Sequence, residues 1–435
     1  MSTATTKKSR NPAKIGLLQE AVETGLAALP HTFLEKQISK KLKEQMATPP
    51  EGLARQMAEH LLSGSSEPFN AEGVGDDVDV HITIDESDMK EVEAGILRFQ
   101  DEDLPELLRS MTEDTAKRTL RSLKTSWPNE QQMQESDLAG FRERMQHRWE
   151  KPLGQLRMLL TMVREWCGEV HAREQGATQS TGHKTRELLI RMLVRACQIA
   201  DEVLCLLENG FADGAMARWR TLHEIAIVAA VVSQYGDEIT ERYIEHQYVE
   251  SKRAMDKYNA CSPDLGFRPL SARDQKRILE EYQRVITVHG KGFKSDYGWA
   301  AHHLMKGQPT FVDLETAAGR AEMRSYYQMG NDNIHAGIKS MYVRLGLVGG
   351  FGGLLSGRSN AGLTDPGQNT AHTLTQLAVL VCGSQPTFDD NVVSLMLCEL
   401  RDEIPRSFSK VDARIKAEEK AIRTKGRKPH TKRKP

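Results

Sequence analysis

Cysteine is scarce in this sequence, and its spacing excludes two kinds of site. The chain has 435 residues but only six cysteines, at positions 167, 197, 205, 261, 382 and 398. None of them forms a CxxC pair, so neither a structural zinc site nor a disulfide framework is expected. Isolated cysteines are typical of a reducing compartment. The sequence therefore predicts no metal ligands and a cytoplasmic location.

Long hydrophobic runs are also missing. The longest, at 225–232 and 377–383, are far shorter than the roughly 20 apolar residues that a membrane-spanning helix needs. Residues 1–16 include basic side chains, but no apolar run follows them, so a secretory signal is not expected. The sequence predicts a protein without membrane contact.

The common catalytic and phosphate-binding motifs do not occur either. The glycine-rich stretch 346–353 lacks the GK[ST] of a phosphate-binding loop, and no predicted strand precedes it. The chain has no HExxH zinc motif and no GxSxG nucleophile elbow. We therefore predict no cofactor.

Charge is balanced overall but uneven along the chain. The net charge is −1, which predicts no general attraction to nucleic acid. Residues 67–106 hold 14 Asp/Glu against 2 Lys/Arg, and residues 410–435 hold 11 Lys/Arg against 3 Asp/Glu. The basic tail is a candidate for binding RNA or another polyanion, and a merely solubilising role is the alternative. It lacks interleaved aromatic residues, so it offers no base stacking.

Apolar residues recur at helical spacing over most of the chain. Residues 78–84 alternate apolar and polar side chains instead, which is typical of a strand. The short connection 208–214 predicts that the helices on either side of it pack antiparallel. The predicted fold class is all-α, a multi-helix bundle of long antiparallel helices with a minor β element near residues 78–84.

A chain of this length is expected to form more than one core. Composition and periodicity divide it into four predicted segments. These are N-terminal helices (1–66), an acidic linker with a short strand and a helical segment (67–171), a C-terminal α-helical bundle (185–409), and a basic, disordered tail (410–435).

The stretch 217–228, ARWRTLHEIAIV, predicts a helix with two different sides. Arg220 and Glu224 are four residues apart and can pair, and His223 lies on the adjacent flank. Trp219, Leu222 and Ala226 face the other way, toward a core. The polar flank is either a structural ion pair or the floor of a pocket.

Two further stretches place polar side chains on one helical face. Tyr243, His246 and Glu250 form a stripe that suits acid–base chemistry or, equally, a surface salt pair. Tyr327, Asn331 and His335 are spaced by four, with Asn333 beside them and Gly330 between them. His335, a histidine with polar neighbours, is the strongest catalytic candidate in the chain. The alternative is that it is a hydrogen-bonded histidine of the core.

Five blocks of sequence in order resemble a bacterial family known as a domain of unknown function, family 5677. They are RACQIADEVLCLLENGFADGAMARWRTLHEIAIVAAVV, ERYIEHQYVESKR, YGWAA, QPTFVDLE and YYQMGNDNIHAG. The resemblance covers about residues 185–345. It implies the extent of the helical bundle and recurring polar positions at Arg220, Glu224 and His335, and it implies no activity.

A second resemblance is to HEPN-type ribonucleases, small α-bundles of toxin and phage-defence systems. Their Arg-x4–6-His motif lies at a dimer interface, which would imply a homodimer. Arg218 and His223 have this spacing, but a helix places them about 140° apart, and Trp219 stands where a polar residue is usual.

Two functional hypotheses follow, and whether the protein is an enzyme stays open. The first is a sensor, scaffold or binding protein in which the polar residues form buried pairs. The alternative is a HEPN-like ribonuclease or nucleotide-acting effector in a toxin or phage-defence system. In that alternative His335 acts as general acid–base and Arg220 stabilises phosphate charge, in a pocket with His223 and Glu224.

Overall fold

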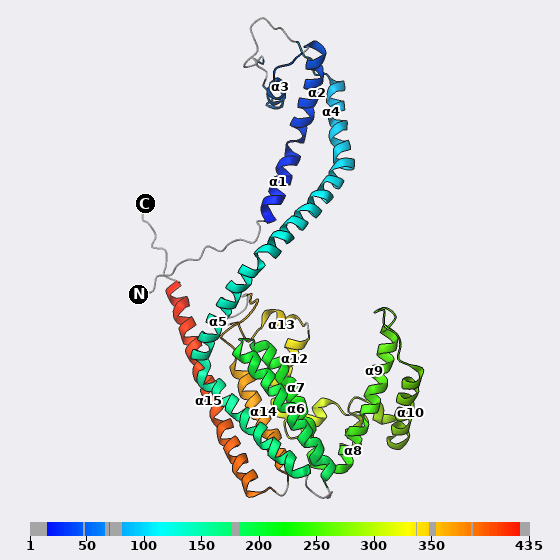
Figure 1. Cartoon of the computed structure of the whole chain (residues 1–435), viewed down its shortest axis with the longest axis vertical. Coiled ribbons are helices and arrows are strands. Elements are labelled where there is room, and N and C mark those ends of the chain that lie inside the picture. Colours follow the sequence, from blue (N-terminus) through cyan, green and yellow to red (C-terminus); the bar gives the residue numbers. More distant parts are fainter. Residues whose placement is uncertain are drawn as a thin grey trace. The chain divides into compact units, whose positions relative to one another are not determined.

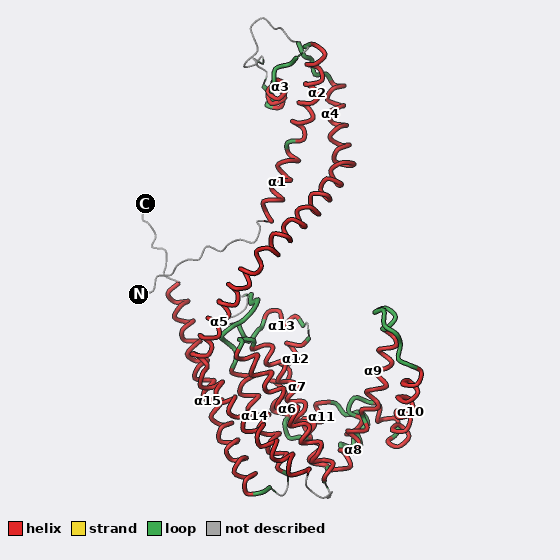
Figure 2. Tube along the Cα trace, in the orientation of Figure 1, coloured by secondary structure: helices red, strands yellow, loops and turns green. Residues whose placement is uncertain are grey.

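The structure is a computed structural model that describes residues 15–46, 48–65, 69, 81–175, 182–335, 337–347, 354–383 and 386–426. These residues are mostly helical and include no β-strand (Figure 2). The all-α fold is therefore confirmed. The chain divides into two compact units, residues 1–133 and 134–435, and the division falls within helix α5 (Leu104–Gln175).

The N-terminal unit is built around a small core between three helices. It contains α1 (Ile15–Ala27), α2 (Leu29–Gln45), α3 (Leu53–Leu62), α4 (Glu86–Arg98) and a π-helical turn at 99–103 that leads into α5. Leu34, Ile38 and Leu42 of α2 are buried against α3 and against Val92 of α4. The spacing of these α2 residues by four places them on one face of the helix, which explains why that face is buried.

The β element predicted near residues 78–84 is only partly within the described residues. Residues 78–80 lie outside them, and residues 81–85 form no strand. Ile82 and Ile84 still face one way, toward the small core, as the alternation predicts. Side chains take the place of a partner strand: Lys41 donates to the carbonyl of Thr83, and the Gln45 amide donates to that of His81.

The C-terminal unit is a bundle of long helices (Figure 1). It contains residues 134–175 of α5, α6 (His183–Glu208), α7 (Ala212–Tyr235), α14 (Thr364–Cys382) and α15 (Phe388–Gly426). Only three residues separate α6 from α7, and these two helices lie side by side, as the short connection predicts. Buried residues from all five helices, including Trp149, Trp219 and Phe408, form one core.

A second core lies where α7 meets the segment that follows it. This segment comprises α8 (Asp237–Glu245), α9 (Gln247–Cys261), α10 (Ala272–His289), short 3-10 turns at 291–294, 298–300 and 321–323, α11 (Phe311–Ala317), α12 (Arg324–Ile334) and α13 (Ile338–Tyr342). Phe293, Trp299 and Leu314 are buried there against Ile227 and Val231 of α7. Helix α7 therefore contributes one side to each core.

The first core of the C-terminal unit extends across two of the predicted segment boundaries. Leu153, Leu160 and other residues of α5 belong to the same core as α6 and α7, although a boundary was predicted between 171 and 185. The basic tail was predicted from residue 410, and α15 continues through it to Gly426, with Val411 and Ile415 packed on the core. Residues 427–435 lie outside the described residues.

Two helical glycines provide a matched test of this packing. A Cβ atom at Gly367 in α14 would lie 2.3 Å from the Phe408 ring, whereas one at Gly168 in α5 would meet nothing within 4 Å. We expect Gly367→Ala to lower the free energy of unfolding by about 1–3 kcal/mol through overpacking. Gly168→Ala should raise it by up to about 1 kcal/mol, because alanine is the better helix former. Urea unfolding followed by circular dichroism measures both, and effects of the same sign would contradict the packing described.

Candidate functional site

Helix α7 has the two sides that its sequence predicts. Trp219 and Leu222 are fully buried, Ala226 is buried, and the Trp219 indole donates to the hydroxyl of Thr373 on α14, 3.0 Å away. Arg220 and Glu224 are only partly buried and form an ion pair at 2.8 Å. Arg218 points elsewhere, to Glu202 on α6. The side chains that could carry chemistry are therefore those on the α7 flank that faces α11 and α12.

His223 is more deeply buried than its place on the polar flank predicts. Only 2% of it is exposed, and its ring lies against those of Trp219, Phe311 and Tyr327. Its Nε2 lies 3.2 Å from Oε1 of Glu315 in α11, which is itself 1% exposed. The other Glu315 oxygen accepts from Arg324 of α12 at 2.9 Å. One buried carboxylate thus joins three helices.

The electrostatics of this cluster follow from its burial. Desolvation lowers the pKa of His223, although Glu315 acts in the opposite direction. The unfolded chain therefore takes up a proton on this imidazole at a higher pH than the folded chain does. Below about pH 6.5, the free energy of unfolding therefore decreases as the pH falls.

Tyr327 links Arg220 to Glu224 from the facing helix. Its hydroxyl accepts from Nη2 of Arg220 at 3.0 Å and donates to Oε1 of Glu224 at 2.7 Å. Burial, with Glu224 adding to it, raises the pKa of Tyr327 to about 12. The phenol therefore keeps its proton at neutral pH and remains a donor. The guanidinium of Arg220 also lies 5.0 Å from the centre of the Tyr327 ring, at a cation–π distance.

Gly330 allows α12 to approach α7 closely. A Cβ atom there would lie 3.2 Å from Cβ of Arg220 and 3.3 Å from the carbonyl of Met216. Helix α12 is continuous through Gly330, so the glycine permits a close contact without breaking the helix. Nε of Arg220 and Oδ1 of Asn331 are buried without a hydrogen-bond partner among the described residues. Such atoms are costly in free energy, so a polar ligand atom would be stabilised beside them.

His335 does not join this cluster. Helix α12 ends at Ile334, and His335 has an extended backbone (φ −92°, ψ 141°), so it leaves the face that carries Tyr327 and Asn331. The residue is exposed, and its side chain makes no hydrogen bond or ion pair within the described part of the chain. Asn333 lies nearby and donates to the carbonyl of Met329 one turn back.

Tyr243, His246 and Glu250 stabilise the packing of α8 and α9. The Tyr243 ring packs edge-on against Trp299. Nε2 of His246, a buried residue, lies 2.9 Å from the carbonyl oxygen of Ser295 and donates to it, and Nδ1 lies 3.7 Å from the largely exposed Glu250. The histidine that the sequence offers for acid–base work is thus buried and hydrogen-bonded through Nε2.

The sequence did not single out Glu315 or Arg324, which complete the buried cluster. Glu315 had a signal: it stands at an apolar position of α11, beside Phe311 and Leu314, all three of which are buried. A second polar group, formed by Arg242, Glu245 and His289, was also not recognised in the sequence. Arg242 donates to Nδ1 of His289 at 3.0 Å, and Nε2 of His289 lies 2.5 Å from Glu245, so this imidazole carries its proton on Nε2.

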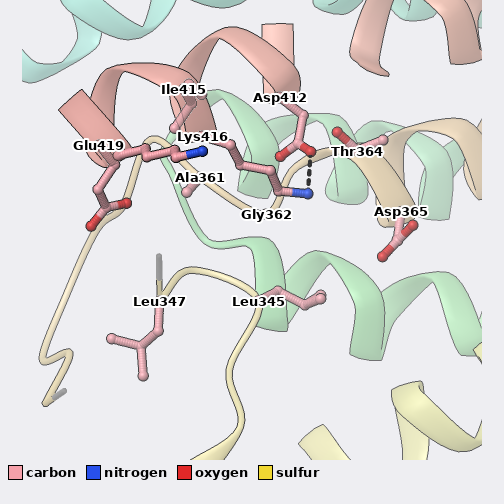
Figure 3. A pocket seen from close by; sticks show the side chains of 11 residues that line it. Leu345, Leu347, Ala361, Gly362, Thr364, Asp365, Asp412, Ile415, Lys416 and Glu419 are labelled. Carbon is pink, nitrogen blue, oxygen red and sulfur yellow. Dashed lines mark ion pairs between the residues drawn. The ribbon is translucent and has the colours of Figure 1, made fainter. Parts of the chain in front are cut away.

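A cavity of about 470 Å³ lies between the start of α14 and the second half of α15 (Figure 3). Asp412 and Lys416 pair across one side of it at 2.6 Å, and burial raises the pKa of Asp365 on the other side. None of the individual site residues predicted from the sequence lines this cavity, although part of the predicted basic tail, including Lys416 and Lys420, does. Among the described ranges, no three His, Cys, Asp or Glu side chains gather in a way that could hold a metal ion. No helix in those ranges has the length and apolar character to cross a membrane.

Residues 186–351 match the model of a family described as Family of unknown function (DUF5677). This segment belongs to DUF5677. It contains Glu315, His223 and Arg324, which we call the Glu315 cluster, together with Arg220, Glu224 and Tyr327. The DUF5677 segment contains the whole second core, but the first core, which includes Trp219, also needs residues of α5, α14 and α15 that lie outside the match. Comparison with curated proteins and with solved structures finds no match.

The buried imidazole gives a pH test. We expect the wild type to lose stability relative to His223→Gln as pH falls from 7 to 5, because glutamine has no proton to gain. Urea unfolding of both proteins at several pH values measures this difference. A wild type that instead gains on the variant as pH falls would show a charged His223 paired with Glu315.

The Tyr327 hydroxyl gives a test of the contact between α12 and the Arg220–Glu224 pair of α7. Tyr327→Phe removes a hydroxyl that bonds two charged groups, and it should lower the free energy of unfolding by about 1–3 kcal/mol. Tyr326→Phe is the matched control, because the Tyr326 hydroxyl has no hydrogen bond within the described residues. The control should change stability by less than about 0.5 kcal/mol, and equal losses in the two variants would refute the assigned role.

Proposed function

We propose that this protein is a binding protein, acting as a sensor or scaffold, and not a catalyst. One observation carries the proposal. Apart from the exposed His335, the polar side chains near α7 that were candidates for acid–base or phosphate chemistry are bonded to one another. His223 contacts Glu315, and Arg220 and Glu224 share the Tyr327 hydroxyl. General acid–base catalysis needs a group within hydrogen-bond reach of a substrate proton, and these groups are already engaged.

The alternative, a HEPN-like ribonuclease or nucleotide-acting effector, has less support. It needs His335 and Arg220 in one site, and within the described residues no hydrogen bond or ion pair joins them, since Arg220 bonds Tyr327 and Glu224. It also needs Arg218 beside His223, but Arg218 pairs with Glu202 and His223 is enclosed by aromatic rings. The exposed His335 is the one feature that favours this alternative, because an exposed imidazole can reach a substrate.

An activity assay separates the two. We expect purified full-length protein to leave RNA oligonucleotides and nucleoside triphosphates intact, at the level of a buffer blank. His335→Ala should behave identically, with Lys339→Ala as a control at a nearby exposed position. Product formed by wild type and by Lys339→Ala, but not by His335→Ala, would overturn the proposal and assign His335 as the catalytic group.

A further inference from the structure

Two arginines converge on the turn that joins α6 to α7. Arg142 of α5 donates from Nε and Nη2 to Oδ1 of Asn209, at 3.1 and 3.0 Å. Arg358, in the segment before α14, donates from Nη1 to the same Oδ1 and to the carbonyl of Asn209, both at 3.0 Å. Two positive charges therefore share one neutral amide oxygen. We call Arg142 and Arg358 the arginine pair.

The arginine pair has no carboxylate within the described residues to balance it. Neither guanidinium forms an ion pair there, and the nearby Glu208 is already paired with Arg157. Asn209 caps the C-terminal end of α6, whose partial negative charge amounts to about half an elementary charge. Stacking of Arg358 over Phe211, 4.8 Å from the ring centre, adds a modest attraction. These terms leave an excess of about one and a half positive charges at a part-exposed site.

The backbone holds this convergence in place. Gly210 has a φ of +75°, and a Cβ atom there would lie 2.5 Å from the carbonyl of Ser359 and 2.7 Å from the Phe141 ring. The Ser359 amide donates to the carbonyl of Gly210 at 2.9 Å. Phe141 and Ser359 are the chain neighbours of the arginine pair. The close approach that glycine permits therefore brings both guanidinium groups to Asn209.

A pocket of about 320 Å³ is lined by Phe211, the ring over which Arg358 lies. Leu206, Phe211 and Leu355 give it an apolar wall, and Gly210 and Gly357, the neighbours of Asn209 and Arg358, line it as well. Asp213 borders the pocket, but its carboxylate is engaged by Arg344 and by the Leu345 amide. The pocket suits one small, flat, largely apolar body.

We propose that the arginine pair binds the phosphate of a small phosphate monoester, with the body of the ligand in the pocket beside Phe211. Arginine forks match phosphate oxygens in pairs, and one phosphate supplies the negative charge that the site lacks. A nucleoside monophosphate has the required parts, one phosphate and one flat ring system. This inference names a ligand class for the proposed binding function and uses a site separate from the Glu315 cluster.

Isothermal titration calorimetry on the full-length protein tests this site, with AMP, adenosine and inorganic phosphate as probes. We expect saturable binding of AMP that is tighter than that of either part alone. Arg142→Gln and Arg358→Gln should each weaken it at least about tenfold, since each removes charge-assisted bonds to the phosphate. Asn209→Asp places a carboxylate between the guanidinium groups and should abolish it.

Arg195→Gln is the matched control. Arg195 on α6 also donates to a neutral amide, that of Gln198 at 2.7 Å. Within the described residues, however, no second arginine donates to that amide. The Arg195→Gln variant should bind AMP as tightly as the wild type does. Thermal unfolding of every variant checks that each one folds. Absence of AMP binding in wild type, or equal binding in Arg358→Gln and Arg195→Gln, would overturn the inference.

Two further outcomes separate this site from neighbouring explanations. Binding of inorganic phosphate as tight as that of AMP would refute the role of the pocket, and binding of a short RNA without AMP binding would refute the small ligand. Recovery of intact AMP after titration agrees with a binding protein. Recovery of adenosine would contradict the proposed function while leaving the site itself in place.

Discussion

The arrangement of the DUF5677 segment depends on one buried carboxylate. Glu315 is 1% exposed and is bonded on one oxygen by His223 of α7 and on the other by Arg324 of α12. A buried carboxylate is tolerated only when its partners remain in place, and removal of one partner typically costs about 3–5 kcal/mol. Glu315 therefore constrains α7, α11 and α12 together. The contact of Tyr327 with Arg220 and Glu224, and the close approach at Gly330, both depend on that constraint.

The sequence alone was sufficient for the architecture of α7 but not for its partners. Helical spacing correctly separates Trp219, Leu222 and Ala226 from Arg220 and Glu224, because periodicity is a local property. It could not show that His223 is buried, since the group that compensates it, Glu315, lies 92 residues away. It also could not show that α12 stops at Ile334, which separates His335 from Tyr327 and Asn331.

The same limit explains the remaining differences. The alternation of residues 78–84 indicates one-sided burial, which Ile82 and Ile84 have, but the bonds from Lys41 and Gln45 that replace a partner strand come from about 40 residues away. The basic composition of the segment from 410 onward does not show that Val411 and Ile415 keep this part of α15 on the core. Composition describes a segment by itself, and packing against distant residues decides its structure.

The central claim is that Glu315, through His223 and Arg324, holds α7, α11 and α12 together. A double-mutant cycle with Glu315→Leu and Arg324→Leu, measured as free energies of unfolding, tests it most directly. We expect Glu315→Leu and Arg324→Leu each to lower the free energy of unfolding by about 3 kcal/mol or more. The double variant should lose clearly less than the sum of these two losses, because it leaves no unpaired charge from this pair. Small, additive losses of about 1 kcal/mol or less would contradict it.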